Sequence, residues 1–345
     1  ECYNTRATCQ DVPNYTKTTK VYRFCQPRAD LPKGINMHPV IVGDPDFAPV
    51  GAPVFGVGDR GKVTLTLQDF PHNDLSVDPY VANRSYDPES QGTFFGKWIA
   101  RNPYYIGRTF VIKSGFITDP FSWDNYQDRT YIIEKIDGPD SSGKIKIYGI
   151  DFLQLASDER SKVAVQTCGT YGSGLTDSPV VINIIGDCSE YAASGYVRIG
   201  DEIYQYTGQT IPSPITGDST LTGITRATWG STQEDPSVGD TVQMCVSWTA
   251  TNVVDIVYDL LVNYAGVDST KIPYSQGSPQ DEWDTEKEDW LSNNNLTAII
   301  SEPTGIKTLL EELCEENQFS IYVDQVNDKV KLVTNNPPAL NEPYV

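Results

Sequence analysis

The sequence predicts a mainly β fold with an α+β part toward its carboxyl end. Apolar and polar residues alternate one by one at 63–67 and again at 144–148. This period of two is typical of a half-buried antiparallel strand. After residue 250 the apolar period lengthens to that of a helix, with Val253, Ile256 and Leu260 on one stripe. We therefore expect sheets first, followed by helices that cover a sheet.

The first part of the chain is expected to contain four main strands, at 63–67, 109–113, 130–135 and 144–148, and a shorter β segment at 20–25. A segment dense in proline and aromatic residues separates the first two strands, which favours a small β-barrel with one long excursion. Six prolines between Pro27 and Pro53 exclude a regular helix over 26–61. This segment is expected to form either an extended arm or a long loop that packs on its own barrel. Residues 138–144 match most of a phosphate-binding loop, but Ile145 replaces the Ser or Thr that would bind magnesium. A hairpin turn is therefore predicted there.

In the rest of the chain the residue pattern changes twice, and each change predicts a different type of structure. A short helix at 151–158 precedes strands at 180–185, 195–199, 202–206 and 241–244, which predict a small all-β insertion. Helices are predicted at 253–264, ended by Gly266, and at 306–314, behind Pro303 and a Thr304 cap. A hairpin of strands 319–324 and 329–334 follows. The acidic run 281–290 predicts a solvated loop, because it lacks the spacing of an EF-hand.

These elements predict three domains, since a single core rarely exceeds about 250 residues and the chain has 345. They are a β-barrel domain over 1–165 with its proline-rich arm, an all-β insertion domain over 166–248, and an α+β domain over 249–345. The sequence begins at Glu1 without an initiator methionine and stops soon after a predicted strand. We therefore expect it to be the front portion of a longer protein.

The charge of the chain argues against several classes of partner. Its formal net charge is −20, whereas nucleic acids and anionic membranes attract basic surfaces. DNA that merely passes through an acidic pore remains compatible with this charge. No window of eighteen apolar residues predicts a membrane span.

Few residues suggest catalysis. The only histidines, His38 and His72, each neighbour a proline in a predicted loop, and neither a zinc-binding His-Glu-x-x-His string nor a Gly-x-Ser-x-Gly nucleophile elbow occurs. The 46 acidic residues always contain some pairs at a usable distance, so a two-carboxylate glycosidase stays an alternative.

The seven cysteines are the chemically informative set, and their odd number excludes complete pairing within one chain. Cys314 falls on the apolar stripe of a predicted helix, as a small buried hydrophobic residue would. The absence of a Cys-x-x-Cys string argues against zinc. Free structural thiols or a disulfide formed late remain open for the set.

Several strings together resemble a known family. They lie at 64–70, 78–80, 96–105 and 133–139, with further ones at 2–10 and 194–200. In combination they are similar to the hub, or tail-tip, proteins of long-tailed bacteriophages, the lambda-type tail-tip family, over nearly the whole chain. These strings indicate an architecture and identify no catalytic residue.

The resemblance implies a non-enzymatic baseplate hub at the distal end of the tail. Such a hub is a homotrimer whose barrel domains adapt the six-fold tail tube to the three-fold tip. The implied partners are the distal tail protein, the tape-measure protein and the central fibre or spike, with DNA present only in transit. The trimer would close the tube until receptor engagement lets the tape measure and DNA pass. Assembly would occur in the host cytoplasm, and the missing carboxyl-terminal part would supply a second barrel.

The resemblance also bears on the cysteines, because some lambda-type tail-tip proteins hold a [4Fe–4S] cluster. Residues 160–168 are similar to the segment that leads to the first ligand of that cluster, which assigns this role to Cys168. The closely spaced partners expected next are missing, and Cys188 and Cys245 follow only 20 and 77 residues later. A rival set therefore combines Cys168 with Cys2, Cys9 and Cys25. Cys188 and Cys245 remain alternatives.

Two other function classes stay open at this point. The content of 20 Tyr and 6 Trp favours a secreted or surface carbohydrate-binding module, which would be a monomer that binds glycans. A tail-associated hydrolase would instead lose lytic activity when single acidic residues are removed.

Overall fold

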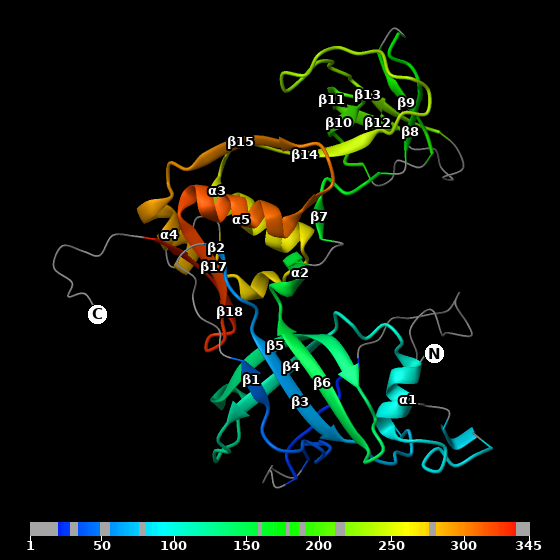
Figure 1. The fold of residues 1–345 in the computed structure, drawn as a ribbon, viewed down its shortest axis with the longest axis vertical. Helices are drawn as coiled ribbons and strands as arrows, with labels where there is room; N and C mark the ends of the chain where they lie inside the picture. The colour runs from blue at the N-terminus through cyan, green and yellow to red at the C-terminus, as the bar shows by residue number, and fades with distance from the viewer. Residues whose placement is uncertain are drawn as a thin grey trace, which may run out of the picture. The chain divides into compact units, whose positions relative to one another are not determined.

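The structure is a computed structural model that describes residues 20–27, 34–48, 56–75, 81–83, 85–157, 161–167, 169–176, 180–186, 191–210, 218–275 and 281–335. It is mainly β, with several sheets and few helices (Figure 1). The chain divides into two compact units. Unit 1 comprises Glu1–Gly51, Asp59–Gln154 and Val323–Lys329, and unit 2 comprises Ala52–Gly58, Leu155–Tyr322 and Val330–Val345. The predicted division into three domains stays a prediction.

Unit 1 contains a five-stranded antiparallel sheet in the order β1-β3-β6-β5-β4 (Figure 1). Its strands are β1 (Asp46–Ala48), β3 (Lys62–Gln68), β6 (Lys144–Asp151), β5 (Tyr126–Asp137) and β4 (Thr109–Gly115). The four main strands predicted for this region are confirmed. Among the described residues β1 and β4 are the two edges of the sheet, and no pairing joins them.

The core of unit 1 lies between this sheet and a helix that was not predicted. Alternation in β3 buries Val63, Leu65 and Leu67, and helix α1 (Phe94–Arg101) buries Phe94 and Phe95. The side chain of Asp69 accepts a hydrogen bond of 2.9 Å from the backbone N–H of Phe95, so a residue distant in sequence caps the first turn of α1.

Two smaller expectations for unit 1 had opposite outcomes. The phosphate-loop-like string connects β5 and β6, so the predicted hairpin turn is confirmed. Gly138 has a φ of 108°, and a Cβ there would lie 2.6 Å from the carbonyl oxygen of Lys144. The turn therefore requires glycine. The β segment predicted at 20–25 is wrong, since only Phe24 forms an isolated bridge there, with His38.

Two four-stranded sheets enclose one core in unit 2. The first has the order β11-β10-β14-β15, with β11 (Glu202–Tyr206), β10 (Gly195–Ile199), β14 (Gln243–Asn252) and β15 (Asn295–Ile300). The second has the order β12-β13-β9-β8, with β12 (Gly208–Thr210), β13 (Ser219–Thr222), β9 (Ile182–Ile185) and β8 (Thr170–Ser173). The strands predicted in this region are confirmed, and the last one continues much further than expected. Their shared core includes Ile182, Ile184, Val197, Tyr204 and Leu221.

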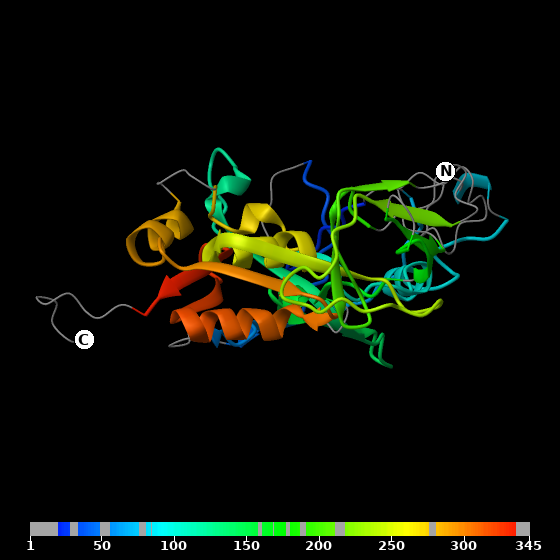
Figure 2. The same cartoon turned by 90° about the horizontal axis from the view of Figure 1, so that it is seen from above.

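Strand β14 leads directly into the helical part of unit 2. Helix α3 (Val253–Asp259) continues as one π-helical turn, η5 (Leu260–Tyr264), and α3 packs against β14 and α5 (Ile306–Asn317) (Figure 2). Strands β17 (Phe319–Asp324) and β18 (Lys329–Thr334) then form the predicted hairpin, and β2 (Gly56–Val57) pairs in parallel with β17. The prediction of two helices followed by a hairpin is confirmed.

The acidic run was predicted wrongly, because it forms helix α4 (Glu282–Trp290). Trp283 is fully buried and donates its indole N–H to the carbonyl oxygen of Val330 at 2.9 Å. One buried tryptophan thus anchors a helix whose other residues are mostly charged. The predicted Thr304 cap is also wrong: α5 begins after Gly305, and Thr304 belongs to the short strand β16 (Thr304–Gly305).

The remaining elements are short. They are α2 (Gln154–Ser157), β7 (Lys162–Val163) and the 3-10 turns Val81–Asn83, Trp123–Asn125 and Ser269–Lys271. Within the ranges that the structure describes, no helix has the length and apolar character needed to cross a membrane.

Candidate functional site

The cysteines predicted as cluster ligands are only partly visible. Cys2, Cys9, Cys168 and Cys188 lie outside the described residues. Cys25 is a half-buried free thiol of unit 1, and Cys245 is a buried free thiol of unit 2. Burial raises the pKa of Cys25, and it raises the pKa of Cys245 to about 12.

Of the predicted ligands and their alternatives, only Cys25 and Cys245 lie among the described residues, whereas an iron–sulfur cluster needs four ligands. The described part of the chain brings no three metal-ligating side chains together. The cluster therefore stays a prediction, and iron analysis of an anaerobic preparation tests it.

The two histidines meet in unit 1, although they are distant in sequence. The rings of His38 and His72 lie 5.7 Å apart at 79°, and both contact Phe94. The Nδ1 atom of His72 accepts the backbone N–H of Asp74 at 3.0 Å, which places the proton of the neutral ring on Nε2. Burial, followed by the neighbouring His72, lowers the pKa of His38. The pair is thus part of an aromatic core.

Beside the histidines, one buried carboxylate binds two cations. Asp74, 3% exposed, lies 3.0 Å from Lys97 Nζ and 2.6 Å from an Nη atom of Arg101. Lys97 also donates to the carbonyl oxygens of His72 and Pro88, at 2.6 and 2.8 Å. Burial raises the pKa of Asp74, but its bonds to Arg101 and Lys97 outweigh that effect and lower the pKa overall. Since Lys97 uses all three of its protons, this cluster fixes α1 to the preceding loops.

A cavity of about 300 Å³ opens beside that cluster. It is lined by Asp74, Tyr86, Gln91, Lys97, Ala100 and Arg101. The three charged side chains leave one net positive charge there. They bond to one another, so this cavity is first a structural ion cluster.

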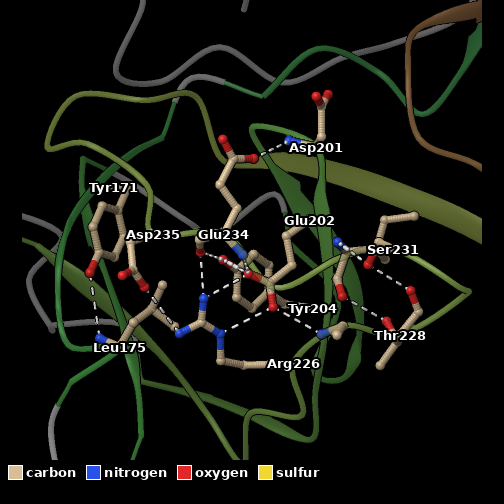
Figure 3. A network of polar contacts seen from close by, with 12 residues as sticks. Tyr171, Leu175, Asp201, Glu202, Tyr204, Arg226, Thr228, Ser231, Glu234 and Asp235 are labelled. Carbon is tan, nitrogen blue, oxygen red and sulfur yellow. Dashed lines mark hydrogen bonds and ion pairs between the residues drawn. The ribbon is translucent and has the colours of Figure 1, made fainter.

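A second polar network, in unit 2, surrounds Glu202 (Figure 3). The fully buried carboxylate accepts hydrogen bonds from the guanidinium of Arg226, the hydroxyl of Tyr204 and the backbone N–H groups of Ala227 and Glu234. Burial raises the pKa of Glu202, but these donors outweigh it and lower the pKa to about 2. A carboxylate with every acceptor position occupied is structural, because nothing remains to bind a substrate.

The Glu202 network holds a strained loop that carries Trp229. Ala227 and Trp229 have φ values of 53° and 55°, in the left-handed region that most side chains avoid. The bond from Ala227 N–H to Glu202 and the bond of 3.0 Å from Thr228 N–H to the carbonyl oxygen of Ile203 keep them there. Trp229 in turn packs edge-on against Tyr196 on β10, with ring centroids 5.7 Å apart.

A further cavity, of about 380 Å³, lies in unit 2 at the ends of β10, β14 and β15. Most of its lining residues carry polar or charged side chains, and the lining consists of Arg198, Gly200, Asp240, Thr241, Gln243, Ser301, Glu302 and Pro303. Arg198 bonds to Glu302 at 2.5 Å and to the carbonyl oxygen of Gly200 at 2.7 Å.

Several large apolar side chains are exposed on and beside β4, which is an edge strand of the unit 1 sheet among the described residues. On and beside β4, Tyr104 is 71% exposed, Ile106 69%, Val111 47%, Phe116 88% and Ile117 43%. We call these five residues the β4 apolar edge. The loop that carries Phe116 is held by a bond from Asn125 to the Thr118 hydroxyl at 2.8 Å and by contacts among Phe121, Trp123 and Tyr126. Phe116 thus lies in an exposed loop whose far end is held by these contacts.

Comparison of the chain with models of protein families, with curated proteins and with solved structures gave no match. Assignment of a function to this chain therefore depends on its own residues. Neither of the two polar networks nor the β4 apolar edge was predicted from the sequence. The nearest available signal was the density of aromatic residues between 92 and 126.

Proposed function

We propose that this chain is a structural subunit of the tail tip of a long-tailed bacteriophage, and that copies of it assemble along the β4 apolar edge. The observation that carries the proposal is that edge. Among the described residues, strand β4 pairs with another strand on one side only. Five large apolar side chains are exposed on or beside it. Exposed apolar strand edges otherwise promote aggregation, so a soluble protein normally covers them.

Assembly along this edge fits the family that the sequence resembles. A sheet with β1 and β4 free can join the sheets of neighbouring copies, so that several copies build the wall of a ring. The predicted tube-like β-barrel then belongs to the assembly, to which each copy contributes one sheet. We propose a homotrimer, in keeping with the three-fold tip of such tails.

The role proposed for the ring is mechanical, and the subunit is not an enzyme. The ring joins the distal tail protein to the central fibre or spike and closes the tube until the tape-measure protein and DNA pass. The net charge of −20 suits a bore that DNA crosses without binding. The site of action is the virion, after assembly in the host cytoplasm.

Mass photometry and negative-stain imaging of the full chain test this proposal. We expect ring-shaped trimers. The double variant Val111→Lys/Phe116→Asp should shift them to monomers, because charge on an edge strand opposes pairing. Leu75→Asp is the matched control, since Leu75 is 59% exposed in the same unit but lies outside the β4 apolar edge. A wild-type chain that stays monomeric at micromolar concentration contradicts the proposal.

A further inference from the structure

One face of the β11-β10-β14-β15 sheet combines aromatic and polar groups in a way that the tail-tip proposal does not use. Along β10 the burial alternates, so that Val197 and Ile199 enter the core while Tyr196 and Arg198 point to the opposite face. Residues two apart on a strand lie about 7 Å from each other on the same face. Tyr196 and Arg198 are therefore neighbours on this face.

The aromatic part of this face is a corner formed by Trp229 and Tyr196. Both rings are half-buried and stand nearly perpendicular, at 81°. Trp229 is held by the strained loop that the Glu202 network fixes, so its position is set before any ligand arrives. Such preorganisation removes part of the entropy cost of binding.

The polar part of the face is the cavity of about 380 Å³ beside Arg198. Several lining groups keep unused hydrogen-bonding capacity among the described residues. They are the hydroxyls of Thr241 and Ser301, the side-chain carbonyl of Gln243, and one carboxylate oxygen each of Asp240 and Glu302. The cavity thus offers both donors and acceptors within a small volume. A ligand that fits it must carry several hydroxyl or amide groups.

The charges of the cavity restrict the ligand further. Arg198 contributes one positive charge, whereas Asp240 and Glu302 contribute two negative ones. Asp201 adds another negative charge nearby. Its carboxylate lies 3.5 Å from the guanidinium of Arg198, and its side chain is 93% exposed. This excess of negative charge repels phosphates, uronic acids and other anions.

We propose that this face binds a neutral saccharide. One sugar ring packs its C–H face against Trp229, and the hydroxyls of the adjoining ring bond to Thr241, Ser301 and Gln243 in the cavity. Aromatic rings pack against the apolar face of a sugar, and polar side chains form hydrogen bonds with its hydroxyls. This site contains groups of both kinds. We call it the Trp229 site. The inference does not depend on the tail-tip proposal, because it uses unit 2 alone and requires no assembly.

Isothermal titration calorimetry of the full chain with maltotetraose, cellotetraose and chitotetraose tests this inference. We expect a dissociation constant in the millimolar to micromolar range for at least one of the three. Trp229→Ala should weaken binding by about tenfold or more, since an aromatic anchor is lost. Thr241→Val/Ser301→Ala should weaken it by about fivefold. Trp290→Ala is the matched control, because Trp290 is 52% exposed on α4 and outside the site.

Circular dichroism of each variant separates a lost contact from a lost fold, and Trp229→Phe, which keeps an aromatic face, should retain most of the affinity. Absence of binding by the wild type to all three probes at about 5 mM overturns the proposal. Equal affinity of Trp229→Ala and the wild type overturns it as well. Unchanged affinity of the double hydroxyl variant overturns the assignment of the cavity.

Discussion

The guanidinium of Arg226 forms two hydrogen bonds, of 3.1 and 2.7 Å, with the carboxylate of Glu202, which is completely buried. The two residues are 24 positions apart, and the pair connects β11 to the loop that carries Trp229. A buried ion pair adds little compared with apolar packing, but removal of one partner leaves an uncompensated charge. This asymmetry makes the pair a sensitive probe of unit 2.

Arg226→Met should destabilise the chain by about 3–5 kcal/mol, because Glu202 then loses its counter-charge inside the core. Urea unfolding followed by tryptophan fluorescence measures this loss. Asp235→Asn is the control: Asp235 lies 3.6 Å from Arg226 but is 91% exposed, so it should change stability by less than about 1 kcal/mol. Similar losses for both variants would contradict a buried role for Glu202.

The stability of unit 2 should also depend on pH through Glu202. Its pKa falls from 4.5 to about 2 in the fold, so its contribution is complete above about pH 4.5 and is lost as the pH falls toward 2. The contribution is on the order of 3 kcal/mol. Urea unfolding at several pH values should give a shallower pH dependence for Glu202→Gln than for the wild type in this window. Parallel curves for the two proteins would show that Glu202 does not titrate as described.

Asp74→Asn should destabilise unit 1 by about 2–4 kcal/mol, because Lys97 and Arg101 then face each other without the carboxylate between them. The change in thermal unfolding of the variant measures this cost. Asp128→Asn offers a matched control, since Asp128 pairs with Lys113 at 2.5 Å but both side chains are about 40% exposed. That exposed pair should contribute less than about 1 kcal/mol. A larger loss for Asp128→Asn would reverse this ranking of the two ion pairs.

Much of the secondary structure could be predicted, because it follows from local periodicity. The strands of unit 1 and the helices α3 and α5 bury residues at the spacing that the sequence displays. Helix α4 was missed because its hydrophobicity is low and Trp283 is its only buried apolar residue. Helix α1 was missed because two glycines and a proline flank or interrupt its segment. In both cases tertiary contacts outweigh local preference.

The candidate sites were much less predictable than the elements. His38 and His72 meet only because Phe94 and Phe70 place both rings in one aromatic cluster. Glu202 and Arg226 resembled ordinary surface charges in the sequence, since their pairing depends on how a loop returns to the edge of β11. Pairings between distant residues leave no periodic signal along the chain, and this chain offered no short motif that announced them.

The open β4 edge has a consequence for how copies of the chain behave in salt solutions. In the assembly proposed above, twenty excess negative charges repel free copies in dilute buffer, while the apolar side chains of the edge favour contact at short range. At about 0.1 M ionic strength the repulsion between exposed charges is screened beyond about 10 Å, whereas the apolar attraction persists. If copies associate along the β4 apolar edge as proposed, adding salt should therefore favour their association.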